Sequence, residues 1–332
     1  MRYLNRELTF NTPESERLDT YLTAVCDTTR SQVTKWIKHG VVRVNGKPAA
    51  KNGVLLHEGD VVVLSFDEFE KEVKPELSPE DLALLEKVSV VGETEDFVVI
   101  DKPSGLITHP SRFVESQYDV ANTVSVSAWV LKHTPSVWGV GEYANRPGIV
   151  HRLDKETSGL MVIVKNQKMF AHVKDQFKSR KTEKQYITLA HGVIEEDSGV
   201  LDFEIAMGKD GKMAARPKVR QVNLQTVRTL QKGKDAVTEY EVMQRFAGYT
   251  LVRAKPRTGR THQIRVHFFA YNHPLVGDPV YVNKKIQHAR DRKLGRLFLH
   301  SHKLAFSDLM GEQCNFESKL PPELTSFIDK LT

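Results

Sequence analysis

The sequence has few cysteines and no long apolar run. Its 332 residues include only two cysteines, Cys26 and Cys314, too few for a disulfide framework or a cysteine-rich zinc site. No apolar run approaches the ~20 residues that span a bilayer, and the segment after Met1 lacks the apolar core of a signal peptide. We therefore expect a protein of the reducing cytoplasm with no membrane partner.

Motifs for common cofactors and metals are also missing. The sequence contains no phosphate-binding P-loop and no G-x-G-x-x-G fingerprint. His262 and His267 are five residues apart, so they do not share a helix face as the paired histidines of zinc proteases do. We expect neither a cofactor nor a metal.

The composition that remains is that of a folded, mildly basic protein. Hydrophobic residues make up 40% of the chain, which excludes a disordered composition, and the length is sufficient for two domains. The formal net charge is +6. This excess is a weak indication of an anionic partner, because many basic proteins bind no nucleic acid.

The N-terminal segment is patterned as two short helices followed by a hairpin. Apolar residues of 15–25 recur at helical spacing, a second helix opens near Arg30, and Asn45-Gly46 is a strong hairpin signal. No acidic residue lies between Thr28 and His57. The basic residues of that interval are Arg30, Lys35, Lys38, Arg43, Lys47 and Lys51. They can form one face that binds RNA phosphates, although a plain solvated surface would carry the same charges.

An acidic segment separates this region from the rest of the chain. Residues 67–81 hold seven acids, two lysines and two prolines, a composition typical of a solvated, extended connector. We place a linker at residues 67–84, between a small domain at 14–66 and a larger domain at 85–325.

The stretch from His151 to Leu160 is the centre of the larger domain. A charged His-Arg-x-Asp cluster lies in a loop that leads into the apolar run 160–164, which is typical of a buried strand. Arg152 and Lys155 flank Asp154 and favour its ionised form, and an ionised, positioned carboxylate can act as a nucleophile. Considered alone, Asp154 could equally cap a turn with its side chain.

Strands and helices alternate on both sides of this stretch. The pattern predicts strands at 97–100, 185–190 and 249–254, and helices at 167–179 and from Thr261. Residues 208–220 are rich in lysine and arginine and are predicted to form a basic loop. A strand, a glycine turn at Gly259 and a helix expose free N–H groups that suit a phosphate.

Several of these segments together resemble the RluA-type pseudouridine synthases. The resemblance rests on His151-Arg152-Leu153-Asp154 with Thr157-Ser158-Gly159-Leu160, on Asp101-Lys102-Pro103-Ser104-Gly105-Leu106 with His109-Pro110, and on Gly259-Arg260-x-His262-Gln263-Ile264-Arg265-x-His267. It implies that Asp154 is the catalytic nucleophile and that Arg265 forms an ion pair with it. It also implies that Tyr186 stacks on the target base, and that the segment 101–110 packs beside the catalytic loop in a structural capacity.

The other expected site residues concern RNA. Arg152 fills the space left by a flipped base or holds a phosphate, and Arg260 and His262 are expected at the RNA. In the N-terminal segment, Arg17-Leu18-Asp19 and Arg43-Val44-Asn45-Gly46 resemble the S4 RNA-binding domain over residues 16–65. Its expected RNA contacts are Arg30, Lys35, Lys38 and Arg43.

The resemblance as a whole implies an enzyme without cofactor or metal. We expect an α+β protein, with a small S4 domain joined to a catalytic domain built on a mixed or antiparallel sheet. The combination is similar to synthases of RluD and RluC type, so we expect a monomer that isomerises uridines of 23S ribosomal RNA. The alternatives are a synthase acting on tRNA, a non-catalytic RNA-binding or ribosome-assembly factor, and, last, a glycosylase that lacks a recognisable second carboxylate.

Overall fold

The computed structural model describes most of the chain. The described residues are 6–26, 30–38, 40–65, 77–110, 117–208, 211–217, 233–283, 285 and 287–331. The chain divides into two compact units, which we call the first unit (Met1–Ser78 with Ser111–Asn122) and the second unit (Pro79–Pro110 with Thr123–Thr332). Within the described ranges, no helix combines the length and the apolar character needed to cross a bilayer.

The first unit contains a small antiparallel sheet and short helices. Its elements are β1 (Arg6–Thr9), β2 (Glu16–Arg17), α1 (Leu18–Val25), α2 (Arg30–Lys38), β3 (Val42–Val44), β4 (Lys47–Pro48), β5 (Leu55–Leu56), β6 (Val61–Leu64) and, from its second segment, α5 (Gln117–Ala121). The sheet order is β1-β6-β3-β4, and β2 pairs with β5. Asn45 (φ 51°) and Gly46 (φ 75°) both have positive φ between β3 and β4, which is the hairpin turn that the sequence predicts.

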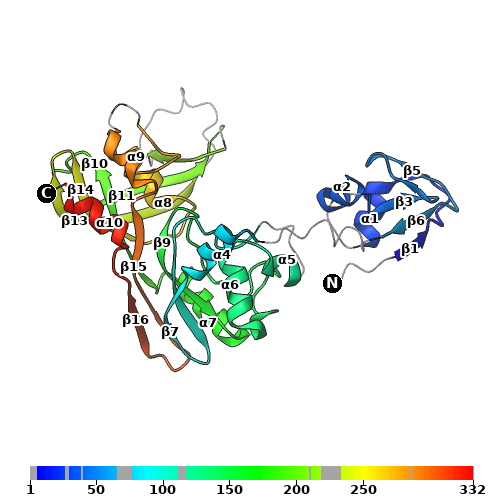
Figure 1. Ribbon diagram of the computed structural model, residues 1–332, viewed down its shortest axis with the longest axis horizontal. Coiled ribbons are helices and arrows are strands. Elements are labelled where there is room, and N and C mark those ends of the chain that lie inside the picture. The colour runs from blue at the N-terminus through cyan, green and yellow to red at the C-terminus, as the bar shows by residue number, and fades with distance from the viewer. Residues whose placement is uncertain are drawn as a thin grey trace. The chain divides into compact units, whose positions relative to one another are not determined.

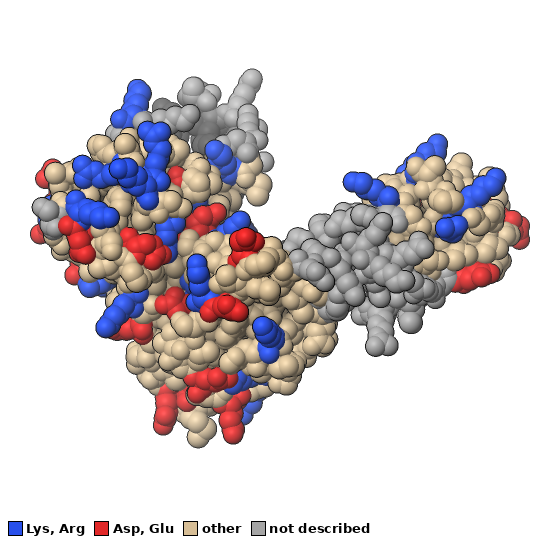
Figure 2. Space-filling model, viewed as in Figure 1, with Lys and Arg blue, Asp and Glu red and all other residues tan. Residues whose placement is uncertain are grey.

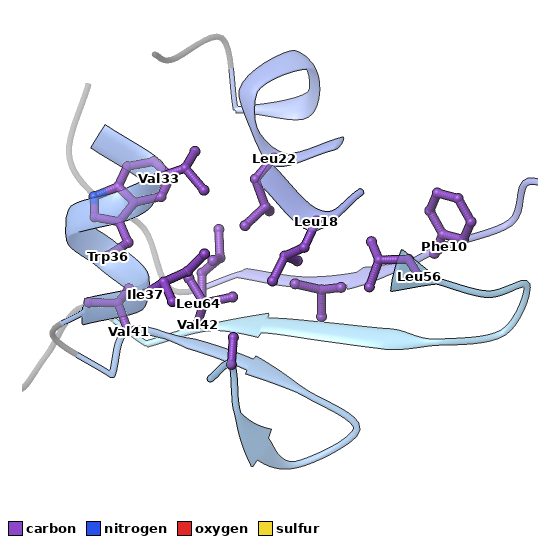
Figure 3. Close-up of a cluster of buried hydrophobic side chains, with 12 residues drawn as sticks. Phe10, Leu18, Leu22, Val33, Trp36, Ile37, Val41, Val42, Leu56 and Leu64 are labelled. Atoms are coloured by element: carbon purple, nitrogen blue, oxygen red, sulfur yellow. The ribbon is translucent and has the colours of Figure 1, made fainter. Parts of the chain in front are cut away.

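The core of the first unit lies between its helices and its sheet. Figure 3 shows Leu18 and Leu22 of α1 and Trp36 of α2 facing Val42 of β3 and Leu64 of β6, and all five side chains are buried. Residues four apart share one face of a helix, so the apolar spacing in the sequence places these side chains toward the sheet. Arg30 and Lys38 of α2 are left at the surface, whereas Asp19 of α1 is buried.

The second unit contains most of the secondary structure. Its helices are α4 (Pro79–Glu86), α6 (Val126–His133), the 3₁₀ helix η1 (Pro135–Val137), α7 (Gln167–Lys178), α8 (Gln263–Ala270), α9 (Ala289–Leu294) and α10 (Pro322–Asp329). Its strands are β7 (Ser89–Glu93), β8 (Phe97–Lys102), β9 (Ser158–Val164), β10 (Glu183–His191), β11 (Ser198–Met207), β12 (Met213–Pro217), β13 (Lys234–Phe246), β14 (Tyr249–Pro256), β15 (Leu299–Ser307) and β16 (Gln313–Glu317).

These strands form one continuous sheet (Figure 1). Their order is β12-β11-β13-β14-β10-β15-β9-β8-β7, with β16 paired to β15. The β9–β15 pair is parallel, and the neighbouring pairs are antiparallel. The sheet is therefore mixed and mainly antiparallel, and the predicted α+β class is confirmed.

Strand β9, which lies within this sheet, is buried along its whole length, at all seven of its residues. Helix α7 packs on β9 and β15. Helix α8 packs on β11, β12, β13 and β14, with Ile264 and Phe268 in the apolar core. The loops that precede β9 and α8 are thus held by elements anchored in the same sheet.

Two predicted segments differ from the observed structure. The basic loop predicted at 208–220 is partly wrong, because Met213–Pro217 forms β12 and pairs with β11. Charged residues dominate the composition of that segment and conceal its short apolar centre. The linker predicted at 67–84 lies outside the described residues up to position 76, and from Pro79 it is helical as α4. A proline fits the first turn of a helix, where its missing N–H is not needed.

Candidate active site

Loop 151–157 is held by buried contacts on both sides of Asp154. The ring of His151 stacks on Phe177 with 4.5 Å between centroids, and its Nε2 accepts a 3.0 Å hydrogen bond from the backbone N–H of Val162. Burial lowers the pKa of His151 to about 3, which keeps the ring neutral and able to accept. Leu153 is buried, and the Thr108 hydroxyl donates to its carbonyl at 2.7 Å.

The turn after β8 supports the other end of the same loop. The fully buried Lys102 ammonium donates to the carbonyls of Pro103 (2.9 Å), Leu106 (2.8 Å) and Lys155 (3.3 Å). Burial lowers the pKa of Lys102 to about 7, and the nearby Asp154 carboxylate opposes this shift. These bonds show that the segment 101–110 packs beside loop 151–157, as the sequence predicts.

The register of three neighbouring strands brings Tyr186 to the loop. Ser301 of β15 pairs with Gly159 of β9 on one side and with Tyr186 of β10 on the other. Gly159 has φ 110°, and a Cβ there would collide with the backbone of Ser301, so the close approach requires glycine. Burial raises the pKa of the Tyr186 hydroxyl to about 12, although its hydrogen bond with Ser301 lowers it. Tyr186 is therefore a neutral aromatic side chain.

Asp154 and Tyr186 both line a cleft of about 530 Å³. The lining comes from the catalytic loop, the end of α7, the start of β10, the turn after β14, the first turn of α8 and β15: Val150, His151, Arg152, Leu153, Asp154, Thr157, Lys174, Phe177, Lys178, Arg180, Lys184, Tyr186, Pro256, Arg257, Thr258, Gly259, Arg260, Thr261, His262, Gln263, Ile264, Arg265 and Leu299. Every site residue that the sequence predicts in this unit is in this set. The fold thus brings together residues separated by more than a hundred positions.

Arg265 contacts Asp154 but is held more closely by another carboxylate. Its Nη1 lies 3.5 Å from Asp154 Oδ2, whereas its Nε and Nη2 each donate a 2.8 Å bond to Asp278. Burial alone would lower the pKa of Arg265, but the Asp278 carboxylate and the other carboxylates raise it. Asp278 was not predicted as a site residue, although it ends a segment that resembles the family. The signal that could have indicated it is an acid that directly follows an apolar run and a glycine, Pro274-Leu275-Val276-Gly277.

His262 approaches Asp154 from the first turn of α8. It adopts a left-handed conformation at the N-cap (φ 54°, ψ 22°), and its Nε2 lies 3.9 Å from Asp154 Oδ2. Its Nδ1 lies 3.0 Å from the hydroxyl of the buried Tyr281, another residue that sequence reasoning missed. Burial lowers the pKa of His262, while Asp154 opposes that shift.

Eight of the residues that line the cleft are lysines or arginines. The cationic residues that line it are Arg152, Lys174, Lys178, Arg180, Lys184, Arg257, Arg260 and Arg265. Arg152, Lys178, Arg180 and Arg257 are exposed, and Lys184 lies over the Phe177 ring at 5.6 Å. A cleft with exposed cations at its edge and an aromatic ring inside suits a polyanion that inserts one base.

The remaining predicted RNA contacts lie on the first unit. Arg30, Lys38 and Arg43 are exposed there, and the side chain of Lys35 lies outside the described residues. Figure 2 shows Lys and Arg side chains spread over the visible face of this unit, with Asp and Glu at its edge. This arrangement suits phosphate contacts without base readout.

The described part of the chain contains no group of three or more His, Cys, Asp or Glu side chains that could hold a metal. The buried histidines have other surroundings. His300 lies within hydrogen-bond distance of Ser158 (2.9 Å) and Ser318 (3.1 Å). His267 faces the ring of Phe203.

Comparisons with known proteins agree with this geometry. The family model for RNA pseudouridylate synthases matches residues 96–270, and the S4 domain model matches residues 16–62. An uncharacterized RNA pseudouridine synthase of Aquifex aeolicus is 40% identical over 272 residues, covering 81% of this chain and 77% of the relative. Ribosomal large subunit pseudouridine synthase D of Neisseria meningitidis is 32% identical, covering 95% of this chain and 78% of the relative. Human RNA pseudouridylate synthase domain containing 4 superposes with a TM-score of 0.55 at 26% identity, covering 76% of this chain and 95% of that one.

Proposed function

The chain belongs to the RNA pseudouridylate synthase family, and from this premise we propose that it isomerises specific uridines of large-subunit ribosomal RNA, with Asp154 as the nucleophile. The observation that carries the proposal is the placement of Asp154. Asp154 lines the cleft together with Tyr186, and its Oδ2 lies 3.5 Å from Nη1 of Arg265. Several relatives of this chain are named for the large ribosomal subunit, which supports that substrate.

The reaction requires a base to leave its stack. Flipping a uridine costs about a few kcal/mol, and the cations around the cleft offset this cost by binding the flanking phosphates. Tyr186 offers its ring to the face of the uracil. Arg152, exposed at the edge of the cleft, binds a phosphate or fills the space that the base leaves.

The chemistry exchanges one glycosidic bond for another. Asp154 attacks the ribose or the base and forms a transient bond to it, which breaks again at the end of the reaction and restores the carboxylate. The bond between N1 of uracil and C1′ of ribose breaks, and the uracil turns within the cleft. A bond then forms between C5 and C1′, the C5 hydrogen leaves as a proton, and N1 takes up a proton. Arg265 orients the Asp154 carboxylate, and no redox partner or second substrate is needed.

The first unit provides further contacts to the RNA. Its match to the S4 domain and its exposed Arg30, Lys38 and Arg43 support contacts to RNA phosphates; we also assign Lys35 to this face. Arg260 and His262 bind the RNA at the cleft. We also propose that the protein acts as a monomer in the cytoplasm.

Tritium release identifies the substrate class. The full-length protein is incubated with large-subunit ribosomal RNA or with tRNA, each labelled with tritium at C5 of uridine. We expect release from ribosomal RNA alone. Release from tRNA alone would replace ribosomal RNA by tRNA as the substrate. If the protein bound RNA but released tritium from neither RNA, the proposed enzymatic activity would be contradicted and the role of a ribosome-assembly factor favoured.

A further inference from the structure

The guanidinium of Arg265 contacts three carboxylates at unequal distances. The Arg265 side chain is 1% exposed. Its Nη1 lies 3.5 Å from Asp154 and 3.4 Å from Glu156, which are long contacts for an ion pair. Its Nε and Nη2 form a two-point pair with Asp278 at 2.8 Å each. Asp278 is therefore the main partner of this arginine.

Asp278 is itself fixed by the backbone around it. The N–H groups of Val280 and Tyr281 donate to its Oδ1 at 2.8 and 3.0 Å. Its side chain is 1% exposed, and the Tyr281 ring lies 5.4 Å from the guanidinium carbon of Arg265. A carboxylate bound by two backbone donors and one arginine in a buried site has a single orientation.

This orientation determines where Nη1 points. The guanidinium is planar and rigid, so fixing Nε and Nη2 also fixes the direction of the third nitrogen. The nitrogen left over is the one that contacts Asp154. The position of the nucleophile thus depends on Asp278, although Asp278 does not line the cleft and is not part of loop 151–157.

A purely stabilising role fits these contacts less well. Burying an ion pair is a poor way to stabilise a fold, because desolvation offsets most of the attraction. A pair present only for stability has no reason to direct its free nitrogen at the reacting carboxylate. We infer that Asp278 is a positioning residue for the proposed isomerisation, acting on Asp154 through Arg265. This inference rests on the function proposed above.

The test compares the kinetics of Asp278 variants with a matched control. Tritium release from the substrate RNA gives kcat and KM for the wild type, Asp278→Asn, Asp278→Glu and Asp197→Asn. Asp197 also pairs with an arginine, Arg245, but is 90% exposed. For Asp278→Asn we expect kcat to fall about a hundredfold, the effect of a displacement near 1 Å, with KM within a factor of three. Asp197→Asn is expected to match the wild type in both.

Stability is separated from positioning by the conservative variant. Asp278→Glu keeps the charge and the pair but moves the carboxylate by one methylene, so kcat is expected to fall while the thermal unfolding midpoint stays near that of the wild type. If Asp278→Asn does not fold, the Glu variant decides alone. Wild-type kcat in a folded Asp278→Glu protein would then contradict the inference.

A double-mutant cycle tests the route through Arg265. Arg265→Gln and Arg265→Gln/Asp278→Asn are expected to have the same kcat, because Asp278 then has no guanidinium to direct. A further loss of kcat in the double variant would show that Asp278 acts by another route. Wild-type kcat in a folded Asp278→Asn protein overturns this inference alone. A wild type without tritium release overturns the proposed function and, with it, this inference.

Discussion

The two units place their charged residues in opposite ways. In the first unit Arg30, Lys38 and Arg43 are exposed, and Asp19 is the charged residue that its described part buries. In the second unit Lys102, Arg265, Asp278 and Asp291 are all buried. Burying a charge costs free energy unless it is well paired. A surface that binds phosphates needs no buried charge, whereas a site that aims a nucleophile needs buried charges to fix its geometry.

The largest expected difference between the units concerns their carboxylate–arginine pairs. Asp278→Asn leaves Arg265 buried with weaker partners, so the free energy of unfolding of the second unit should fall by about 3–5 kcal/mol. The matched change in the first unit is Asp19→Asn. Its partner Arg17 is 54% exposed, and the expected loss is below about 1 kcal/mol.

Urea denaturation of the full chain, followed by probes specific to each unit, measures both losses. Equal losses for Asp278→Asn and Asp19→Asn would remove the contrast between a pair in which both side chains are buried and a pair whose arginine is exposed. The contrast would be sharpened if Asp278→Asn lowered the free energy of unfolding of the second unit alone, and Asp19→Asn lowered that of the first unit only slightly.

The second-largest expected difference between the units concerns their stability at acid pH. Burial lowers the pKa of both His267 and His300 to about 4, below the 6.5 of an unfolded histidine. The unfolded chain then binds more protons between these values, so the second unit loses stability as pH falls from 6.5 toward 4. Each histidine accounts for a loss of about 2 kcal/mol between pH 7 and pH 5.

His267→Phe isolates one of these contributions. His267 is fully buried and edge-on to Phe203, so phenylalanine keeps an aromatic ring but cannot take up a proton. The variant is expected to lose less stability between pH 7 and pH 5 than the wild type. Denaturation midpoints at both pH values measure this. An unchanged loss in His267→Phe would mean that His267 takes up its proton over the same pH range in the folded protein as in the unfolded chain.

The smallest expected effect lies in the exposed cations of the first unit. Replacing Arg30, Lys38 and Arg43 by alanine should reduce the slope of log affinity against log salt by up to about 2, because each phosphate contact contributes ~0.7. A matched triple, Lys87, Lys319 and Lys330 to alanine, removes the same charge from exposed positions of the second unit. RNA binding at several salt concentrations measures both slopes. Equal slopes for the two triple variants would mean that the exposed cations of the first unit do not contribute to RNA binding.

The parts of the fold that were predicted correctly depend on local sequence. Asn45-Gly46 specifies its turn by the conformations that those two residues tolerate. Loop 151–157 with the apolar run behind it was recognisable because a buried strand has a strong local pattern. The segment 213–217 was misassigned because it forms a strand by pairing with β11, the preceding strand, although its own composition is basic.

Individual residues of the site could be predicted from the sequence, but the contacts between their side chains could not. Asp154, Tyr186 and Arg265 lie in recognisable motifs, and the fold places all three at one cleft. Asp278 and Tyr281 were missed because their importance depends on which side chains they meet, and these contacts join segments that the sequence keeps apart. Nothing local in the sequence shows that Arg265 binds Asp278 at 2.8 Å and Asp154 at 3.5 Å.

The most direct test of the account is tritium release by the wild type and by Asp154→Asn, with RNA binding measured in parallel. We expect Asp154→Asn to bind the substrate RNA as the wild type does and to lose more than ~10³-fold in kcat, as expected when a nucleophile is removed. Substantial release by a folded Asp154→Asn protein would contradict the assignment of Asp154 and, with it, the reading of this cleft as an active site.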